Sequence, residues 1–93
     1  MNSEFLSFLF NAYGKGQGEK IGKDTVGEYT IDTCYTLDCG WETAVWKEPN
    51  TMVIVARYPD QDTAVEGHKQ WMELCEMRPR QAWSVQLNRY VEF

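Results

Sequence analysis

The residues of this chain that could do chemistry are a single histidine, three cysteines and fourteen acidic side chains. His68 and Cys75 fall on one face of a predicted helix, but seven positions separate them by about 10.5 Å along the helix axis. Ligands of one zinc ion have to converge to within about 4 Å of each other, so these two side chains do not fit one ion. Cys34 and Cys39 could approach each other across a hairpin, but no second pair of ligands accompanies them. We therefore expect no metal site and no cofactor.

Catalysis would need an arrangement that the sequence does not supply. A thiol activated by His68 has to meet it through the fold, and no local motif provides an oxyanion hole or an orienting carboxylate. Asp32, Asp38 and Glu42 could lie close together on a hairpin, but no apolar pocket is identifiable around them. Glu42 is expected to pair with Arg57 across the sheet, and His68 to face the core with a ring nitrogen bonded to a sheet carbonyl or a tyrosine hydroxyl. We therefore predict that the protein is not an enzyme.

A glycine-rich stretch near the amino terminus superficially resembles a phosphate-binding loop. The position that should hold the first glycine of such a loop is Gln17, and Gly22-Lys23 is followed by Asp24 in place of serine or threonine. No strand is expected before it. We expect residues 14–24 to form a flexible connector, in which the glycines permit positive φ and the lysines keep the segment solvated.

Three segments are predicted to pair as an antiparallel sheet. Residues 29–36 alternate along a β-branched and aromatic run, a short turn follows, and residues 41–47 complete a hairpin. After a second turn, the nearly continuous apolar run at residues 52–58 suits a central strand. Residues 83–93 also alternate and predict a further strand. The sequence thus predicts an α+β fold with a three- to four-stranded antiparallel sheet, in a single domain over residues 1–93.

One helix, at about residues 62–77, is predicted to pack on this sheet. Asp60 or Asp62 can cap its first amide groups. Gly67 costs a helix up to about 1 kcal/mol relative to alanine, so we expect a close approach to the sheet or a local bend at this residue. Pro79 ends the helix. The side chains that should face the sheet are Ala64, Val65, His68, Trp71, Met72 and Cys75.

A second helix is predicted at about residues 3–13, and it is apolar over most of its circumference. Such a helix has to be covered on more than one side. It is either an ordinary core helix across the sheet or a contact with another copy or a partner through Phe5, Phe8 and Leu9. The segment is too short to cross a membrane and leads into no cleavage site, so we expect a protein that does not associate with membranes.

The net charge of −5 is unevenly distributed. Residues 24–76 hold eleven acidic side chains against three basic ones, which gives −8, whereas residues 1–23 carry +1 and residues 77–93 carry +2. Direct binding of nucleic acid is disfavoured, because that affinity comes largely from lysine and arginine. A basic or nucleic-acid-binding protein is the electrostatically easier partner, although the simplest interpretation is that these charges solvate the outer faces of the domain.

Three short motifs resemble a set of small, mostly uncharacterised proteins encoded by tailed bacteriophages. They are Trp41-Glu42-Thr43, Val55-Ala56-Arg57-Tyr58 and Ala64-Val65-Glu66-Gly67-His68. The resemblance covers about a third of the chain and carries no catalytic residue. It implies a protein of the infected cell's cytoplasm, where small acidic domains bind and inhibit host machinery, or else a minor virion component. The odd number of cysteines agrees with reduced thiols in that setting, although one disulfide and a free thiol are also compatible with it.

Two functions of different classes are compatible with these features. The first is a non-catalytic phage accessory protein, of the host-takeover or defence-inhibitor type, that binds a host protein through an acidic, aromatic surface. Tryptophan and tyrosine are typical anchors of such interfaces, and the residues expected there are Tyr35, Asp38, Trp41, Glu42 and Trp46. The second is an oligomeric assembly or virion protein, with contacts through the amino-terminal helix and the carboxy-terminal strand. A weaker alternative is a binder of a small ligand such as a nucleotide signal, with a tryptophan or tyrosine stacked on the base and charge supplied by Arg78, Arg80 and Arg89.

Overall fold

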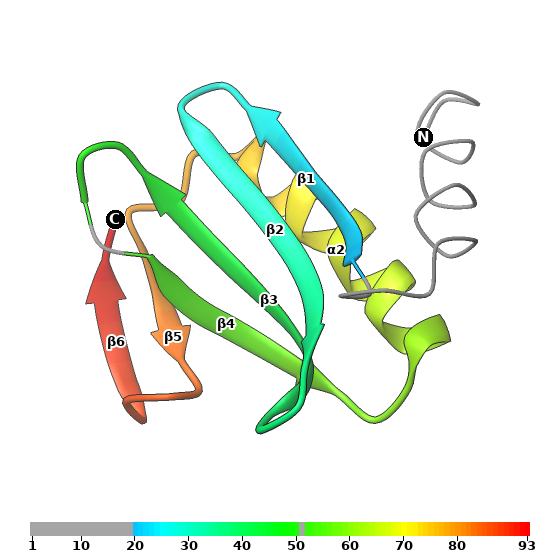
Figure 1. Cartoon of the computed structure of the whole chain (residues 1–93). Helices are drawn as coiled ribbons and strands as arrows, with labels where there is room; N and C mark the ends of the chain where they lie inside the picture. The colour runs from blue at the N-terminus through cyan, green and yellow to red at the C-terminus, as the bar shows by residue number, and fades with distance from the viewer. Residues whose placement is uncertain (1–19, 51) are drawn as a thin grey trace.

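The computed structural model describes residues 20–50 and 52–93, which form a four-stranded sheet, one helix and a two-stranded hairpin (Figure 1). The four strands form an antiparallel meander, so each strand pairs with its neighbour in the chain. The α+β class, the antiparallel sheet and the packed helix are thus confirmed, whereas the helix predicted at residues 3–13 lies outside the described residues. The elements are β1 (Lys20–Val26), β2 (Tyr29–Thr36), β3 (Gly40–Lys47), β4 (Val53–Tyr58), α2 (Gln61–Cys75), β5 (Gln81–Ser84) and β6 (Arg89–Glu92).

Strand β1 replaces part of the flexible connector that the sequence predicts at residues 14–24. From Lys20 onward the chain pairs with β2, with one shift of register between Lys20 and Gly22. Ile21 is fully buried in a cluster with Trp41, so its side chain ties the strand to the core. The prediction is wrong here because one large apolar residue among glycines and lysines carries too little of the alternation by which strands are recognised.

The predicted strand at residues 83–93 is also wrong, because β5 and β6 form a hairpin with a turn at residues 85–88. Ser84 closes the turn: its hydroxyl oxygen accepts a hydrogen bond from the Leu87 amide (2.9 Å), and its carbonyl oxygen accepts one from the Asn88 amide (2.8 Å). Asn88 has a left-handed backbone (φ 59°), which asparagine tolerates better than most residues. The alternation of apolar side chains continues past the turn and conceals it in the sequence.

Helix α2 covers one side of the four-stranded sheet, and no other described helix or strand lies in front of the opposite side, which faces the viewer in Figure 1. The hairpin lies beside β4 and is joined to it by one backbone hydrogen bond, from the Val85 amide to the Ile54 carbonyl (2.9 Å). Two clusters of buried residues fill the interior. The larger contains Tyr29, Ile31, Val45, Val53, Val55, Cys75, Ala82 and Phe93, and the smaller contains Ile21, Trp41 and Ala64.

Two predicted features of α2 are confirmed. Asp60 caps the first turn, where its Oδ1 accepts a hydrogen bond from the Thr63 amide (2.9 Å). Gly67 is buried against the Tyr58 ring of β4, and a Cβ atom at residue 67 would overlap with that ring. The absence of a side chain at this position therefore lets the helix lie closely on the sheet.

We predict that Gly67→Ala destabilises the fold, although alanine is the better helix former by up to about 1 kcal/mol. The added methyl group has to displace the Tyr58 ring, and overpacking of this kind costs about 1–3 kcal/mol. Urea unfolding followed by circular dichroism measures the difference. The control, Glu66→Ala at an exposed position of the same helix, should stay within about 0.5 kcal/mol of the wild type. Unchanged or increased stability of Gly67→Ala would show that the ring moves aside freely.

Candidate functional site

His68 is fully buried within a chain of hydrogen-bonded side chains that crosses the sheet. Its Nε2 lies 2.8 Å from Asp24 Oδ2, and its Nδ1 lies 2.7 Å from Thr33 Oγ1. Thr33 Oγ1 lies 2.6 Å from Thr43 Oγ1, which in turn lies 2.9 Å from the Tyr58 hydroxyl oxygen. We call these five residues the histidine network. Each strand from β1 to β4 contributes one member, and α2 contributes the histidine.

The hydrogen atoms of the histidine network have one consistent order. Burial lowers the pKa of His68 despite its hydrogen bond to Asp24, so the ring is neutral at pH 7. A carboxylate only accepts hydrogen bonds, so His68 donates from Nε2 to Asp24 and accepts at Nδ1 from Thr33. Thr33 then accepts from Thr43, and Thr43 accepts from Tyr58, whose hydroxyl stays protonated because burial raises its pKa.

The order of carboxylate, imidazole and hydroxyl is that of a nucleophile activated by a general base. Here Thr33 and His68 both have zero solvent exposure, and Thr43 occupies the remaining side of the Thr33 hydroxyl. A substrate cannot reach this hydroxyl unless the core opens. The predicted core position of His68 is confirmed, but its partners here are a threonine hydroxyl and a carboxylate. The histidine network therefore fastens α2 to the sheet, and no buried side-chain nitrogen or oxygen of the described residues lacks a hydrogen-bond partner.

Trp41, predicted to be a binding residue of the surface, lies in the core. Its side chain is 9% exposed and belongs to the buried cluster with Ile21 and Ala64. The reason is strand alternation: Thr43 joins the histidine network beneath α2, so Trp41, two residues earlier in β3, points to the same side. The prediction of a surface position is therefore wrong.

The other four predicted binding residues do not form one surface. Tyr35 is 40% exposed on the helix side of the sheet and contacts Trp41 edge to face, with ring centroids 5.3 Å apart. Glu42 and Trp46 alternate with Trp41 and point to the opposite side. Asp38 is exposed in the turn between β2 and β3. The structure thus divides the predicted surface between two faces of the sheet and one turn.

The side of the sheet opposite α2 carries charges that compensate one another. Two ion pairs lie there, Lys20–Asp32 at 2.6 Å and Glu42–Arg57 at 3.2 Å. The second pair confirms the contact that the sequence predicts. Trp46 is also engaged on this side, because its indole N–H donates to Glu48 (3.2 Å) and the Lys23 ammonium lies 5.8 Å from its ring centroid. This face is therefore not the acidic surface that the charge distribution predicts.

Uncompensated acidic side chains line the outer side of α2. Asp62, Glu66 and Glu73 are exposed and recur at intervals of four and seven residues, so they follow one side of the helix. We call them the acidic stripe. None of the three has a basic partner within 4.0 Å among the described residues. Asp60 adds a further exposed carboxylate at the start of the helix.

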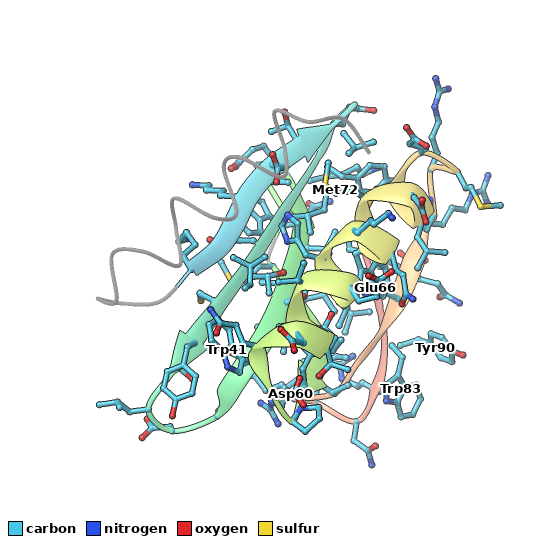
Figure 2. All side chains as sticks on the ribbon, turned by 90° about the vertical axis from the view of Figure 1, so that its right-hand side faces the viewer. Trp41, Asp60, Glu66, Met72, Trp83 and Tyr90 are labelled. Carbon is cyan, nitrogen blue, oxygen red and sulfur yellow. The ribbon has the colours of Figure 1, made fainter. Side chains whose placement is uncertain are left out.

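Trp83 of β5 and Tyr90 of β6 form an exposed aromatic pair directly across the hairpin. They are 43% and 60% exposed, and their rings meet edge to face with centroids 5.1 Å apart. Figure 2 shows both rings to the right of α2, on the side away from the four-stranded sheet, with Glu66 on the helix and Asp60 just before it. Because residues 83–93 were expected to form one strand with Trp83 on its apolar face, this pair is missing from the predicted surface. The turn-forming Asn88 is the signal that could have revealed it.

The cysteines show no arrangement for metal binding or catalysis in the part of the chain that the structure describes. All three are free, and no group of three or more potential ligands comes together there. Burial raises the pKa of Cys34, and it raises the pKa of Cys75 to about 11, so both thiols stay protonated at neutral pH.

The fold defines the class of this protein as α+β, with a four-stranded antiparallel meander, one packed helix and a β-hairpin. Comparison with protein-family models, with curated proteins and with solved structures finds no match to the chain. Within residues 20–50 and 52–93, no helix has the length and apolar character needed to cross a bilayer. The relation to phage proteins that the three short motifs suggest stays a prediction.

We predict that Thr33→Val lowers the free energy of unfolding by about 1–3 kcal/mol, the cost of unsatisfied buried polar groups. The change preserves the side-chain shape but leaves His68 Nδ1 without its donor and Thr43 without its acceptor. Thr25→Val, the same substitution at an exposed position of β1, should shift the value by about 0.5 kcal/mol or less. If both variants unfold at the same urea concentration, the histidine network does not hold the fold together.

We also predict that stability falls as the pH is lowered below 6.5, the ordinary pKa of His68. Burial lowers this pKa in the folded state, so the unfolded state binds more protons between the two values. The stabilisation is complete above pH 6.5 and is lost toward the folded-state pKa, by at most about 1.4 kcal/mol per pH unit for one proton.

Thermal unfolding of the wild type and of His68→Gln, followed from about pH 7.5 to 5, tests this dependence. The variant should lose less stability over the interval, because it lacks the imidazole that takes up the proton. The pKa of Asp60 is lowered from 3.8, so that carboxyl titrates below the interval in both proteins. Equal slopes in the two proteins would exclude His68 as the group responsible.

Proposed function

We propose that the protein is a non-catalytic binding protein whose partner docks on the side of the molecule formed by α2 and the hairpin. The observation that carries the proposal is the exposure of the aromatic pair, 43% for Trp83 and 60% for Tyr90. The resemblance to phage proteins supports a host protein of the infected cell as the partner, and host takeover or inhibition of a host defence as the role.

The aromatic pair is not part of the buried packing of the hairpin. That packing uses other residues of the segment, since Ala82, Ser84 and Phe93 are all buried. The two exposed rings contact each other on the outside. Tryptophan and tyrosine each have a large apolar body with a polar group, and they contribute strongly to binding when a partner removes them from water. Their exposure is thus better explained by an interface than by the stability of the fold.

The acidic stripe determines which partners approach this side most readily. Figure 2 shows Asp60 and Glu66 on the same side of the four-stranded sheet as the aromatic pair. Asp60 and the acidic stripe outnumber Lys69, the one lysine of α2, so the field along the helix is negative. Such a field increases the association rate of a basic partner and disfavours an acidic one, whereas affinity comes mainly from the buried aromatic anchors. A protein with a basic surface, such as one that binds nucleic acid, fits this combination. The alternative of an oligomer formed through Phe5, Phe8 and Leu9 concerns residues outside the described part.

We predict that Trp83→Ala and Tyr90→Ala each weaken partner binding by about 2 kcal/mol or more, while the thermal transition of the free protein changes little. Affinity capture of the tagged protein from infected cells identifies the partner, and calorimetry with the purified partner measures the loss. Leu37→Ala is the control, because it truncates a side chain that is 94% exposed in the β2–β3 turn, outside both α2 and the hairpin. It should bind as the wild type does.

Two results would contradict this proposal. One is full binding by both aromatic variants, and the other is an equal loss in Leu37→Ala. Light scattering on the free protein addresses self-association separately, because a second copy captured in place of a host protein would identify the chain itself as the partner.

A further inference from the structure

A depression of about 580 Å³ lies between the β1–β2 turn, the end of β3 and the loop that follows α2. We call it the terminal depression. It shares no residue with the aromatic pair or the acidic stripe. Its volume is within the range of about 300–1,000 Å³ that small-molecule sites occupy. The charged residues that line it are Glu28, Lys47, Glu76, Arg78 and Arg80.

None of these five charges is compensated by an ion pair. Lys47, Arg78 and Arg80 have no carboxylate within 4.0 Å among the described residues, and neither Glu28 nor Glu76 has a basic group within that distance. On the open side of the sheet, Lys20 and Arg57 are each paired with a carboxylate, whereas Lys23 lies over the Trp46 ring. Three cations without an ion pair thus line one depression of a chain with a net charge of −5.

The walls of the terminal depression are held in place by Tyr29. Its hydroxyl donates to the Pro79 carbonyl (2.6 Å), which anchors the loop after α2, and its ring packs edge to face on Phe93. The Lys47 ammonium lies 5.4 Å from the centroid of the same ring. Arg78 has a left-handed backbone (φ 54°), a conformation that is uncommon outside glycine and that tends to mark functional loops.

The remaining titratable groups of the depression add no negative charge. Burial raises the pKa of Tyr29, so its hydroxyl remains a donor. Burial also raises the pKa of Cys75 to about 11, so its thiol is neutral at pH 7. The depression thus presents three cations against two carboxylates.

We propose that the terminal depression binds a phosphorylated small molecule of the size of a nucleotide. Arginine and lysine bind phosphate oxygens through charge-assisted hydrogen bonds, and Lys47, Arg78 and Arg80 supply these groups. Glu28 and Glu76 repel a bare anion but accept hydrogen bonds from N–H groups. A nucleotide carries both features, a phosphate at one end and base N–H donors at the other. This inference does not depend on the proposed protein partner.

Isothermal titration of the full chain with guanosine 5′-monophosphate, adenosine 5′-monophosphate and inorganic phosphate tests the proposal. We expect both nucleotides to bind more tightly than inorganic phosphate. Lys47→Gln and Arg80→Gln should each raise the Kd for the nucleotides by about tenfold or more. Arg89→Gln, which removes an exposed arginine outside the depression, is the matched control and should leave the Kd within about twofold of the wild type. Circular dichroism verifies that each variant is folded.

The carboxylates have a separate test. Glu28→Gln should reduce the preference for nucleotides over inorganic phosphate, because it removes the charge that repels the bare anion and replaces one of the two acceptor oxygens by an N–H donor. The proposal is overturned if neither nucleotide binds at about 1 mM, or if Arg89→Gln weakens binding as much as the two lining variants do. Equal affinity for inorganic phosphate and the nucleotides would overturn the assignment of a nucleotide-sized ligand.

Discussion

The hydrogen bonds of His68 are the interaction on which the rest of the structure depends. They connect the only described helix to four successive strands through Asp24, Thr33, Thr43 and Tyr58. Tyr58 has two roles, because its hydroxyl ends the histidine network and its ring lies against Gly67. Adjacent residues of α2 therefore define the height of the helix above the sheet and its rotation about its own axis. That rotation in turn directs the acidic stripe toward solvent.

The features that could be predicted from the sequence are those in which a local pattern coincides with the tertiary structure. The alternation at residues 29–36, the cap at Asp60 and the close approach at Gly67 are of this kind. The alternation also places Thr33 among inward-facing residues. That its hydroxyl meets His68 depends on how α2 lies across the sheet, which no local pattern encodes. Asp24 belongs to a strand whose sequence is dominated by glycine, lysine and polar residues, so its role could not be anticipated.

The exposure of individual side chains and the pairing of charges are harder to predict from the sequence than the helices and strands. Trp41 and Trp83 both occupy strands with one buried face, but Trp41 lies on that face, whereas Trp83 alternates with the buried Ala82 and Ser84 and is exposed. The sequence shows how many acidic residues the chain has, but which of them form ion pairs depends on the residues that face them across neighbouring strands. The open side of the sheet is neutralised by pairs such as Glu42–Arg57, whereas α2 and the terminal depression carry charges without partners.

The hairpin is joined to the four-stranded sheet by a single backbone hydrogen bond, from Val85 to Ile54, among the described residues. Within this carboxy-terminal segment, Ala82, Ser84 and Phe93 are buried, whereas Trp83 and Tyr90 are exposed. Neither Trp83 nor Tyr90 belongs to the histidine network, so substitutions at these two positions remove none of its hydrogen bonds. The outward-facing positions of the hairpin can therefore vary in sequence without loss of the hydrogen bonds that hold α2 on the sheet.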